Sequence, residues 1–143
     1  MTSKENASNT RNPNWLVRIM SKLQKRYAEW DCHANEEKRI LYLSSKTSPQ
    51  KEIFLIEIEE GIILIMVKSR LKKRELTDGG IRVLNHLNCK RYYLTHQVDV
   101  ERRLYKCRCI IPKNLLEEQF EQTISYIEGE HRKGKMLLEM ECK

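Results

Sequence analysis

Two apolar runs joined by a short turn are the feature of this sequence that most limits its fold. They occupy residues 53–58 and 62–67 of the stretch KEIFLIEIEEGIILIMVKSR, and Glu59-Glu60-Gly61 separates them. Runs rich in isoleucine, leucine, valine and phenylalanine on either side of such a turn are typical of a β-hairpin. We expect Gly61 to take the left-handed backbone conformation, because glycine has no Cβ that would clash there.

The two arms differ in how their side chains alternate. In the first arm the two faces carry Phe54, Ile56 and Ile58 on one side and Ile53, Leu55, Glu57 and Glu59 on the other. The second arm is apolar on both faces, with Ile63, Ile65 and Val67 opposite Ile62, Leu64 and Met66. This pattern is typical of a central strand, or of a strand whose outer face meets a partner. We therefore take Ile62, Leu64 and Met66 as the candidate partner surface.

Size and charge set the class of protein. A chain of 143 residues forms one ordinary domain that can bury its own core. Lysine and arginine outnumber aspartate and glutamate by 27 to 20, which gives a formal net charge of +7. This basic balance favours acidic partners, namely nucleic acid, an acidic protein face or anionic lipid.

Several features predict a cytoplasmic protein. Apolar runs fall short of the roughly 18 residues that a membrane helix needs. The N-terminus, MTSKENASNTRNPN, lacks the hydrophobic segment of a secretory signal. Five cysteines, an odd number without a regular framework, fit a reducing compartment better than a disulfide scaffold.

Helical and strand patterns cluster along the chain. After a polar tail at 1–13, which we expect to be disordered, a helix is predicted from residue 14, with an apolar stripe and a basic stripe. The basic stripe comprises Arg18, Lys22, Lys25 and Arg26, and we interpret it as a solvated helix face. Three or four strands follow, then a short helix at 77–88, a second hairpin at 90–98 and 102–111, and a long helix after Pro112.

This order, in its shortest form α-β-β-β-α-β-β-α, predicts an α+β fold. Because strands cluster instead of alternating singly with helices, we expect an antiparallel sheet with helices on one face. The predicted division is a single domain at 14–128, preceded by the tail at 1–13 and followed by a helical extension or tail at 129–143.

Basic residues are concentrated after the central hairpin, where five occur in seven positions. The candidate basic patch consists of Lys68, Arg70, Lys72, Lys73 and Arg74 with Lys106 and Arg108 of the second hairpin. Tyr92, Tyr93 and Tyr105 are interleaved with the charges of the second hairpin, as a single-strand binder would require for base stacking. These tyrosines equally fit a core, and no RRM, KH or recognition-helix pattern accompanies them. A solvated loop and sheet edge is the alternative interpretation.

Cysteine and histidine residues indicate no specific chemistry. Cys107 and Cys109 lie two residues apart on a strand, so both thiols face the same way and could bind a soft metal or form a redox pair. Packing as small apolar residues is the favoured interpretation. His86, Cys89 and His96 lack zinc-finger spacing, and no GxSxG, HExxH or phosphate-loop pattern occurs. We therefore expect a non-enzymatic protein with no metal or cofactor.

Two segments carry a resemblance to a known family. GIRVLNHLNCKRYYLTHQVD, followed by RLYKCRCIIPKNLLEEQFEQTISYI, has a short helix with a Leu-Asn pair, a hairpin ending in proline, and a last helix. With the order of elements over about residues 14–128, this resembles the type III secretion chaperone-like fold, and within it the YbjN-type family of small bacterial proteins. The resemblance implies a non-enzymatic homodimer that presents apolar patches to a partner protein. The basic net charge of this chain departs from the family, whose secretion chaperones are commonly acidic.

Two functional hypotheses follow. The first is a protein-binding module, chaperone-like or adaptor-like, that acts as a homodimer in the cytoplasm and uses its basic rims to select acidic partners. The alternative is a nucleic-acid-binding regulator that uses residues 68–74 and the second hairpin.

Overall fold

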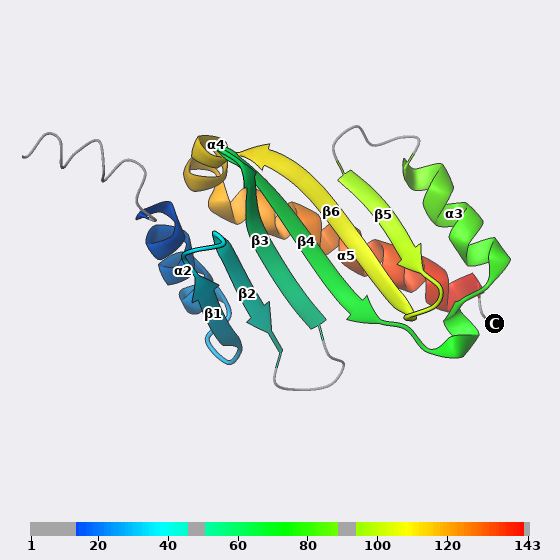
Figure 1. Cartoon of the computed structure of the whole chain (residues 1–143). Coiled ribbons are helices and arrows are strands. Elements are labelled where there is room, and N and C mark those ends of the chain that lie inside the picture. Colours follow the sequence, from blue (N-terminus) through cyan, green and yellow to red (C-terminus); the bar gives the residue numbers. More distant parts are fainter. Residues whose placement is uncertain (1–13, 46–50, 89–93, 142–143) are drawn as a thin grey trace, which may run out of the picture.

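The computed structural model describes residues 14–45, 51–88 and 94–141, and it forms one antiparallel sheet with helices packed against it (Figure 1). The sheet has six strands in the order β1-β2-β3-β4-β6-β5. The strands are β1 (Asp31–Asn35), β2 (Ile40–Ser44), β3 (Lys51–Glu59), β4 (Ile62–Arg70), β5 (Leu94–Asp99) and β6 (Leu104–Pro112). The helical elements are α2 (Asn14–Arg26), the 3₁₀ turn η1 (Lys73–Glu75), α3 (Asp78–Asn88), α4 (Lys113–Glu118) and α5 (Phe120–Glu141). The predicted α+β class is confirmed, and of the three or four strands expected before α3, four form.

The predicted central hairpin is β3 and β4, which lie in the middle of the sheet. Gly61 has a φ of 80°, so the turn uses the left-handed conformation that was predicted for it. The pairing shifts between Glu57 and Glu59, and this β-bulge leaves Ile58 exposed.

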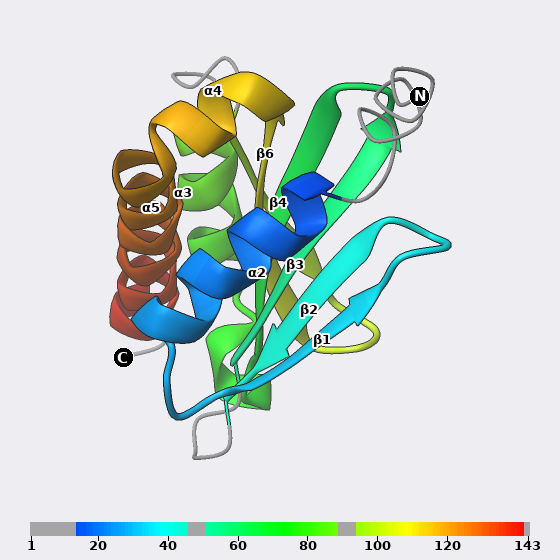
Figure 2. The ribbon, with the colours of Figure 1, turned by 90° about the vertical axis from the view of Figure 1, so that its left-hand side faces the viewer.

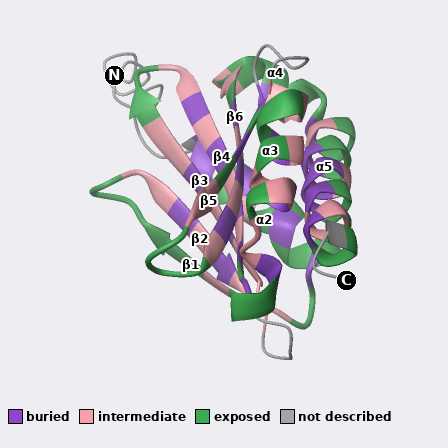
Figure 3. Cartoon of the chain, turned by 90° about the vertical axis from the view of Figure 1, so that its right-hand side faces the viewer, coloured by how far each residue is buried: buried purple, intermediate pink, exposed green. Residues whose placement is uncertain are grey.

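All the described helices lie on one side of the sheet (Figure 2). The inward-facing strand residues alternate with outward-facing ones, so the core forms between the helices and a single face of the sheet (Figure 3). From the central strands this core receives Ile53, Leu55, Ile63, Ile65 and Val67, and from the helices it receives Trp15, Leu16, Ile19, Leu23, Leu84, Leu116, Phe120, Ile124, Ile127 and Leu138. Within the described part of the chain, no helix is both long and apolar enough to cross a membrane.

The predicted long C-terminal helix consists of two helices that meet at Gln119, whose φ of −122° and ψ of 45° interrupt the helical path. From Phe120, α5 continues through Gly129 and Gly134 to Glu141. Its last turns belong to the packed structure, because Leu138 is fully buried in the core. Burial against the sheet stabilises the helix despite glycines that each cost about 1 kcal/mol in a helix interior.

The basic stripe of α2 is exposed, in agreement with the prediction, and three of its residues also contact other helices. Arg18 and Arg26 form ion pairs with Glu117 of α4 and Glu121 of α5. Lys22 donates a hydrogen bond to the Glu117 carbonyl at 3.2 Å. These contacts join α2 to helices that follow it by about a hundred residues, a proximity that local sequence patterns do not encode. The predicted tail at 1–13, and the loop at 46–50, lie outside the described residues.

Candidate functional site

The face of the sheet that points away from the helices, here called the open face, carries the candidate residues. Pairing between strands arranges its side chains in three rows across the sheet. The first row is Ile40, Ile56, Leu64 and Ile110; the second is Tyr42, Phe54, Met66 and Arg108; the third is Ser44, Glu52, Lys68 and Lys106. The face therefore changes from wholly apolar to charged along the strand direction.

The first row and, from the second, Tyr42, Phe54 and Met66 form an apolar patch that is only partly covered. Ile110 is 49% exposed, while Ile56, Leu64, Phe54 and Met66 are half-buried by their neighbours in the sheet. Antiparallel sheets with one uncovered face usually place polar residues on it. Contiguous apolar side chains in that position are typical of an interaction surface.

Aromatic rings hold the second row together. The rings of Tyr42 and Phe54 lie 4.9 Å apart, and the Tyr42 hydroxyl donates a hydrogen bond to Glu52 at 2.6 Å. The Lys68 ammonium lies 5.0 Å from the centre of the Phe54 ring and 3.8 Å from a Glu52 carboxylate oxygen. Lys68 is therefore engaged within the sheet by one ring and one carboxylate.

Lys106 and Arg108 are placed differently. Both are half-buried on the outward face of β6, and neither forms an ion pair within residues 14–45, 51–88 and 94–141. The Arg108 Nε is buried and has no hydrogen-bond partner among the described residues. Arg108 lies between Met66 and Thr95, which provide no carboxylate. An acceptor from outside would therefore satisfy this guanidinium.

The predicted basic run at 68–74 does not form one surface. Lys68 lies on the open face, whereas Lys72, Lys73 and Arg74 belong to the 3₁₀ turn and to the residue before it. That turn packs beside α5, where the buried carboxylate of Glu75 accepts a hydrogen bond from Lys135 at 3.0 Å. Arg70 is exposed at the end of β4, opposite Leu104. By the alternation of β4, Arg70 lies on the same face as Lys68. The structure thus keeps Lys68 and Arg70 on the face that carries Lys106 and Arg108, and it places Lys72, Lys73 and Arg74 apart from them.

Base stacking on Tyr105 is ruled out by its position, so that part of the nucleic-acid interpretation was wrong. Tyr105 is fully buried on the inward face of β6, and its hydroxyl is hydrogen bonded to His96 Nδ1 at 2.6 Å. The odd-numbered residues of β6 face the helices, so Tyr105 points away from Lys106 and Arg108. Tyr92 and Tyr93 lie outside the described residues.

The two cysteines of β6 point inward with Tyr105. Both are buried in the core, as the packing interpretation requires. Burial raises the pKa of Cys107 to about 12 and that of Cys109 to about 11, which keeps both thiols protonated and unreactive at neutral pH. No group of three or more candidate metal ligands occurs in the part of the chain that the structure describes.

A buried polar cluster beneath α5 was not predicted. His131 Nε2 lies 3.0 Å from the Ser69 hydroxyl oxygen, and the rings of His131 and Tyr105 stack 5.0 Å apart. Ser69 and His131 are both buried, so substrates have no access to this pair and we assign it a packing role. The two residues are 62 positions apart, and no local pattern predicts the contact.

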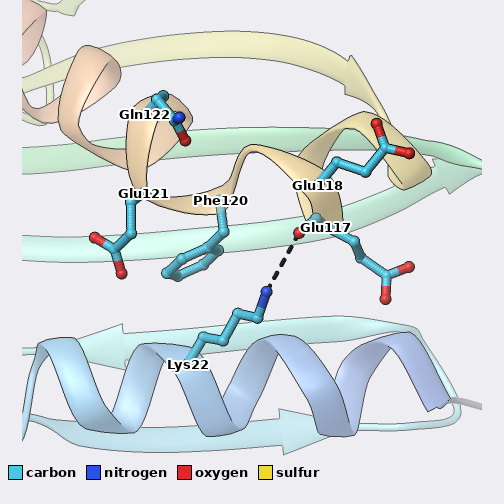
Figure 4. Close-up of a pocket in the computed structure, with 6 residues that line it drawn as sticks. All are labelled: Lys22, Glu117, Glu118, Phe120, Glu121 and Gln122. Carbon is cyan, nitrogen blue, oxygen red and sulfur yellow. Dashed lines mark hydrogen bonds between the residues drawn. The ribbon is translucent and has the colours of Figure 1, made fainter.

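A pocket of about 270 Å³ lies between α2 and the junction of α4 and α5 (Figure 4). Its lining comprises Lys22, Glu117, Glu118, Phe120, Glu121 and Gln122. The carboxylates of Glu117 and Glu121 are already paired with Arg18 and Arg26. We therefore interpret this pocket as the seam between the helices and the open face as the candidate site.

Comparison with known proteins supports the fold. A scan against protein-family models finds no match, and a search of curated proteins also finds none. Among solved structures, the crystal structure of the ExsC-ExsE complex contains a similar chain, with a TM-score of 0.64 and 20% sequence identity over 86% of this chain and 92% of that chain. This similarity agrees with the predicted type III secretion chaperone-like fold and does not reach the YbjN-type family specifically.

Proposed function

We propose that this chain is a protein-binding module, chaperone-like or adaptor-like in character, and that its open face receives the partner. The observation that carries the proposal is the apolar row of Ile40, Ile56, Leu64 and Ile110, which crosses four strands on a face without helices among the described residues. Ile62, Leu64 and Met66, selected from the sequence as the partner surface, all lie on this face. The similar solved structure is that of a complex, which gives the proposal independent support.

The proposal includes a homodimer and membership of the YbjN-type family. Both rest on the resemblance in residues 80–99 and 103–127 and on the order of the elements. A dimer that persists on dilution in sedimentation velocity is the expected result. A monomer at every concentration would contradict the dimer while leaving partner binding untouched.

Site-specific photo-crosslinking in the host cell tests the binding surface. A benzoylphenylalanine at position 110, in the exposed end of the apolar row, is expected to capture a partner protein. The same residue at position 132, which is exposed on α5, serves as the matched control. Leu64→Asp should abolish the capture at position 110, because it places a charge in the centre of the patch. Equal capture at both positions, or capture unaffected by Leu64→Asp, would contradict the proposal.

The basic cluster of Lys68, Lys106 and Arg108 favours a second candidate, a nucleic-acid-binding regulator. Such a protein would bind a labelled 20-nucleotide single strand at low salt and lose affinity steeply as salt rises, because binding releases counterions from the phosphates. Neutralising Lys106 and Arg108 should then weaken binding. Absence of binding at 50 mM salt would eliminate this candidate.

A further inference from the structure

The open face restricts the chemistry of what can cover it, and this inference rests on the proposed function. Its apolar row and its charged row are four residues apart on each central strand, as Leu64 and Lys68 show on β4 and Ile110 and Lys106 show on β6. At about 3.4 Å per residue, the two rows are about 14 Å apart. A single partner segment can therefore contact both rows.

Two cations of this face, Arg108 in its second row and Lys106 in its third, form no ion pair among the described residues. Lys68 already has Glu52 and the Phe54 ring as neighbours, whereas Lys106 and Arg108 have no ion-pair partner among the described residues. Arg108 also has the buried Nε that lacks an acceptor in the same part of the chain. A carboxylate is the group that would satisfy a half-buried guanidinium best, because its two oxygens match the geometry of the donors.

Two other occupants fit the face less well. A second copy would bring another formal net charge of +7 towards the first, which disfavours face-to-face association. A single-stranded nucleic acid would need exposed aromatic rings among the cations. Tyr105 is buried on the opposite face of the sheet. The rings on the open face, Tyr42 and Phe54, are half-buried and pack against each other at 4.9 Å, and Lys68 already covers Phe54. They therefore offer bases less stacking surface than a single-strand binder needs.

We propose that the occupant of the open face is an acidic amphipathic segment of a partner protein. Its large apolar side chains cover the row of Ile40, Ile56, Leu64 and Ile110, and its carboxylates bind Lys106 and Arg108. In an extended segment the carboxylate for Lys106 would be about four residues from the apolar group, and the carboxylate for Arg108 about two. In a helix these spacings become about nine and about five residues, given rises of about 3.4 and 1.5 Å per residue.

Selection from a random library of 16-residue peptides displayed on phage tests this chemistry with the full-length chain as bait. We expect the selected peptides to be enriched in aspartate, glutamate and large apolar residues relative to the starting library. Two of the selected peptides are then synthesised and their affinity for the protein is measured. This affinity should fall at least tenfold with the double variant Lys106→Gln/Arg108→Gln and should weaken as salt rises. The matched control, Lys25→Gln/Arg132→Gln, removes the same charge from exposed positions on α2 and α5 and should change affinity less than twofold.

A charge-reversal variant provides a stricter test. With Lys106→Glu/Arg108→Glu as bait, the selection should turn from acidic to basic peptides, while thermal unfolding verifies that the variant is folded. Selection of no peptide, of peptides without acidic enrichment, or of peptides insensitive to both double variants would overturn the proposal.

The remaining outcomes separate this inference from the proposed function. If Leu64→Asp abolishes peptide binding and Lys106→Gln/Arg108→Gln does not, the binding face stands and the acidic partner is wrong. If Leu64→Asp instead converts a dimer into a monomer, a second copy occupies the face and the inference is overturned. Single-strand binding that is lost with Lys106→Gln/Arg108→Gln would assign these cations to nucleic acid and overturn it as well.

Discussion

Gly134 of α5 lies directly against the hydroxyl end of Tyr105 in β6. A Cβ built at position 134 would be 1.8 Å from the Tyr105 hydroxyl oxygen and 2.5 Å from Cζ. The tyrosine cannot easily retreat, because it is fully buried and its hydroxyl is hydrogen bonded to His96. The absence of a side chain at position 134 is therefore what lets α5 pack so close to the sheet.

Gly134→Ala should destabilise the protein by about 1–3 kcal/mol, the usual effect of overfilling a packed core. Gly129→Ala is the matched control in the same helix, because a Cβ there would have no neighbour within 4 Å. This second change should stabilise the protein by up to about 1 kcal/mol through higher helix propensity. Urea unfolding of both variants measures the difference, and shifts of the same sign would contradict the packing described for Gly134.

His131 should make stability depend on pH in a range where few other groups titrate. Burial lowers its pKa from 6.5 to about 3, and the ammonium of Lys51 in β3 acts in the same direction. Between these two pKa values, the His131 imidazole binds a proton in the unfolded chain and stays neutral in the folded chain. The contribution of His131 to the free energy of unfolding is therefore fully present above about pH 6.5 and is lost as the pH falls towards 3. The loss is at most about 1.4 kcal/mol per pH unit.

Denaturant titrations between pH 5 and 7 measure this slope. This pH window lies above the range in which Glu75 and Glu128 titrate, because their pKa values are lowered from 4.5. Burial opposes the ionisation of both carboxyl groups, but hydrogen bonds and nearby lysines outweigh the effect of burial. His131→Gln should flatten the slope, since glutamine does not titrate. His86→Gln, at an exposed position on α3, should leave it unchanged. An unaltered slope in His131→Gln would mean that another group carries the proton.

Glu57 should be the carboxylate whose loss harms the fold most at the hairpin end of the sheet. It accepts hydrogen bonds from Trp15 Nε1 at 3.0 Å, from Arg39 at 2.9 Å and from the Gly61 amide at 2.8 Å. Glu57→Ala would leave a buried indole N–H and a turn amide without acceptors, which should cost about 2–4 kcal/mol. Glu59→Ala, two residues further on at an exposed position, should change the free energy of unfolding by less than about 0.5 kcal/mol. Comparable losses in both variants would contradict this role.

Cys107 and Cys109 should be protected from alkylation in the folded protein. Their thiols are buried and their pKa values are raised to about 12 and about 11, so little thiolate exists at pH 8. Cys32 is only half-buried on the edge strand β1 and should react before these two. Peptide mass spectrometry after a short N-ethylmaleimide pulse, with and without urea, measures the order. Rapid labelling of the β6 cysteines without urea would revive the redox interpretation.

The resemblance of short segments to a known family predicted the fold class better than it predicted the site. The hairpin of β3 and β4, the glycine in its turn and the helix at Asp78–Asn88 follow from local patterns of apolar spacing and turn residues. The interruption at Gln119 and the continuous path of α5 through two glycines do not, because tertiary packing decides them. The basic run at 68–74 was misleading for a related reason, since the chain leaves the sheet at Leu71 and separates charges that are adjacent in sequence.

The sequence by itself determined which side chains of each strand share a face, because side chains in a strand alternate with a period of two. Ile62, Leu64 and Met66 share one face of β4 for this reason, and Lys106 and Arg108 share one face of β6. Only the tertiary structure decided that β6 pairs with β4, which places Arg108 beside Met66 and Lys106 beside Lys68. Pairing between strands distant in sequence depends on how the whole sheet packs against its helices, and local sequence patterns do not encode it.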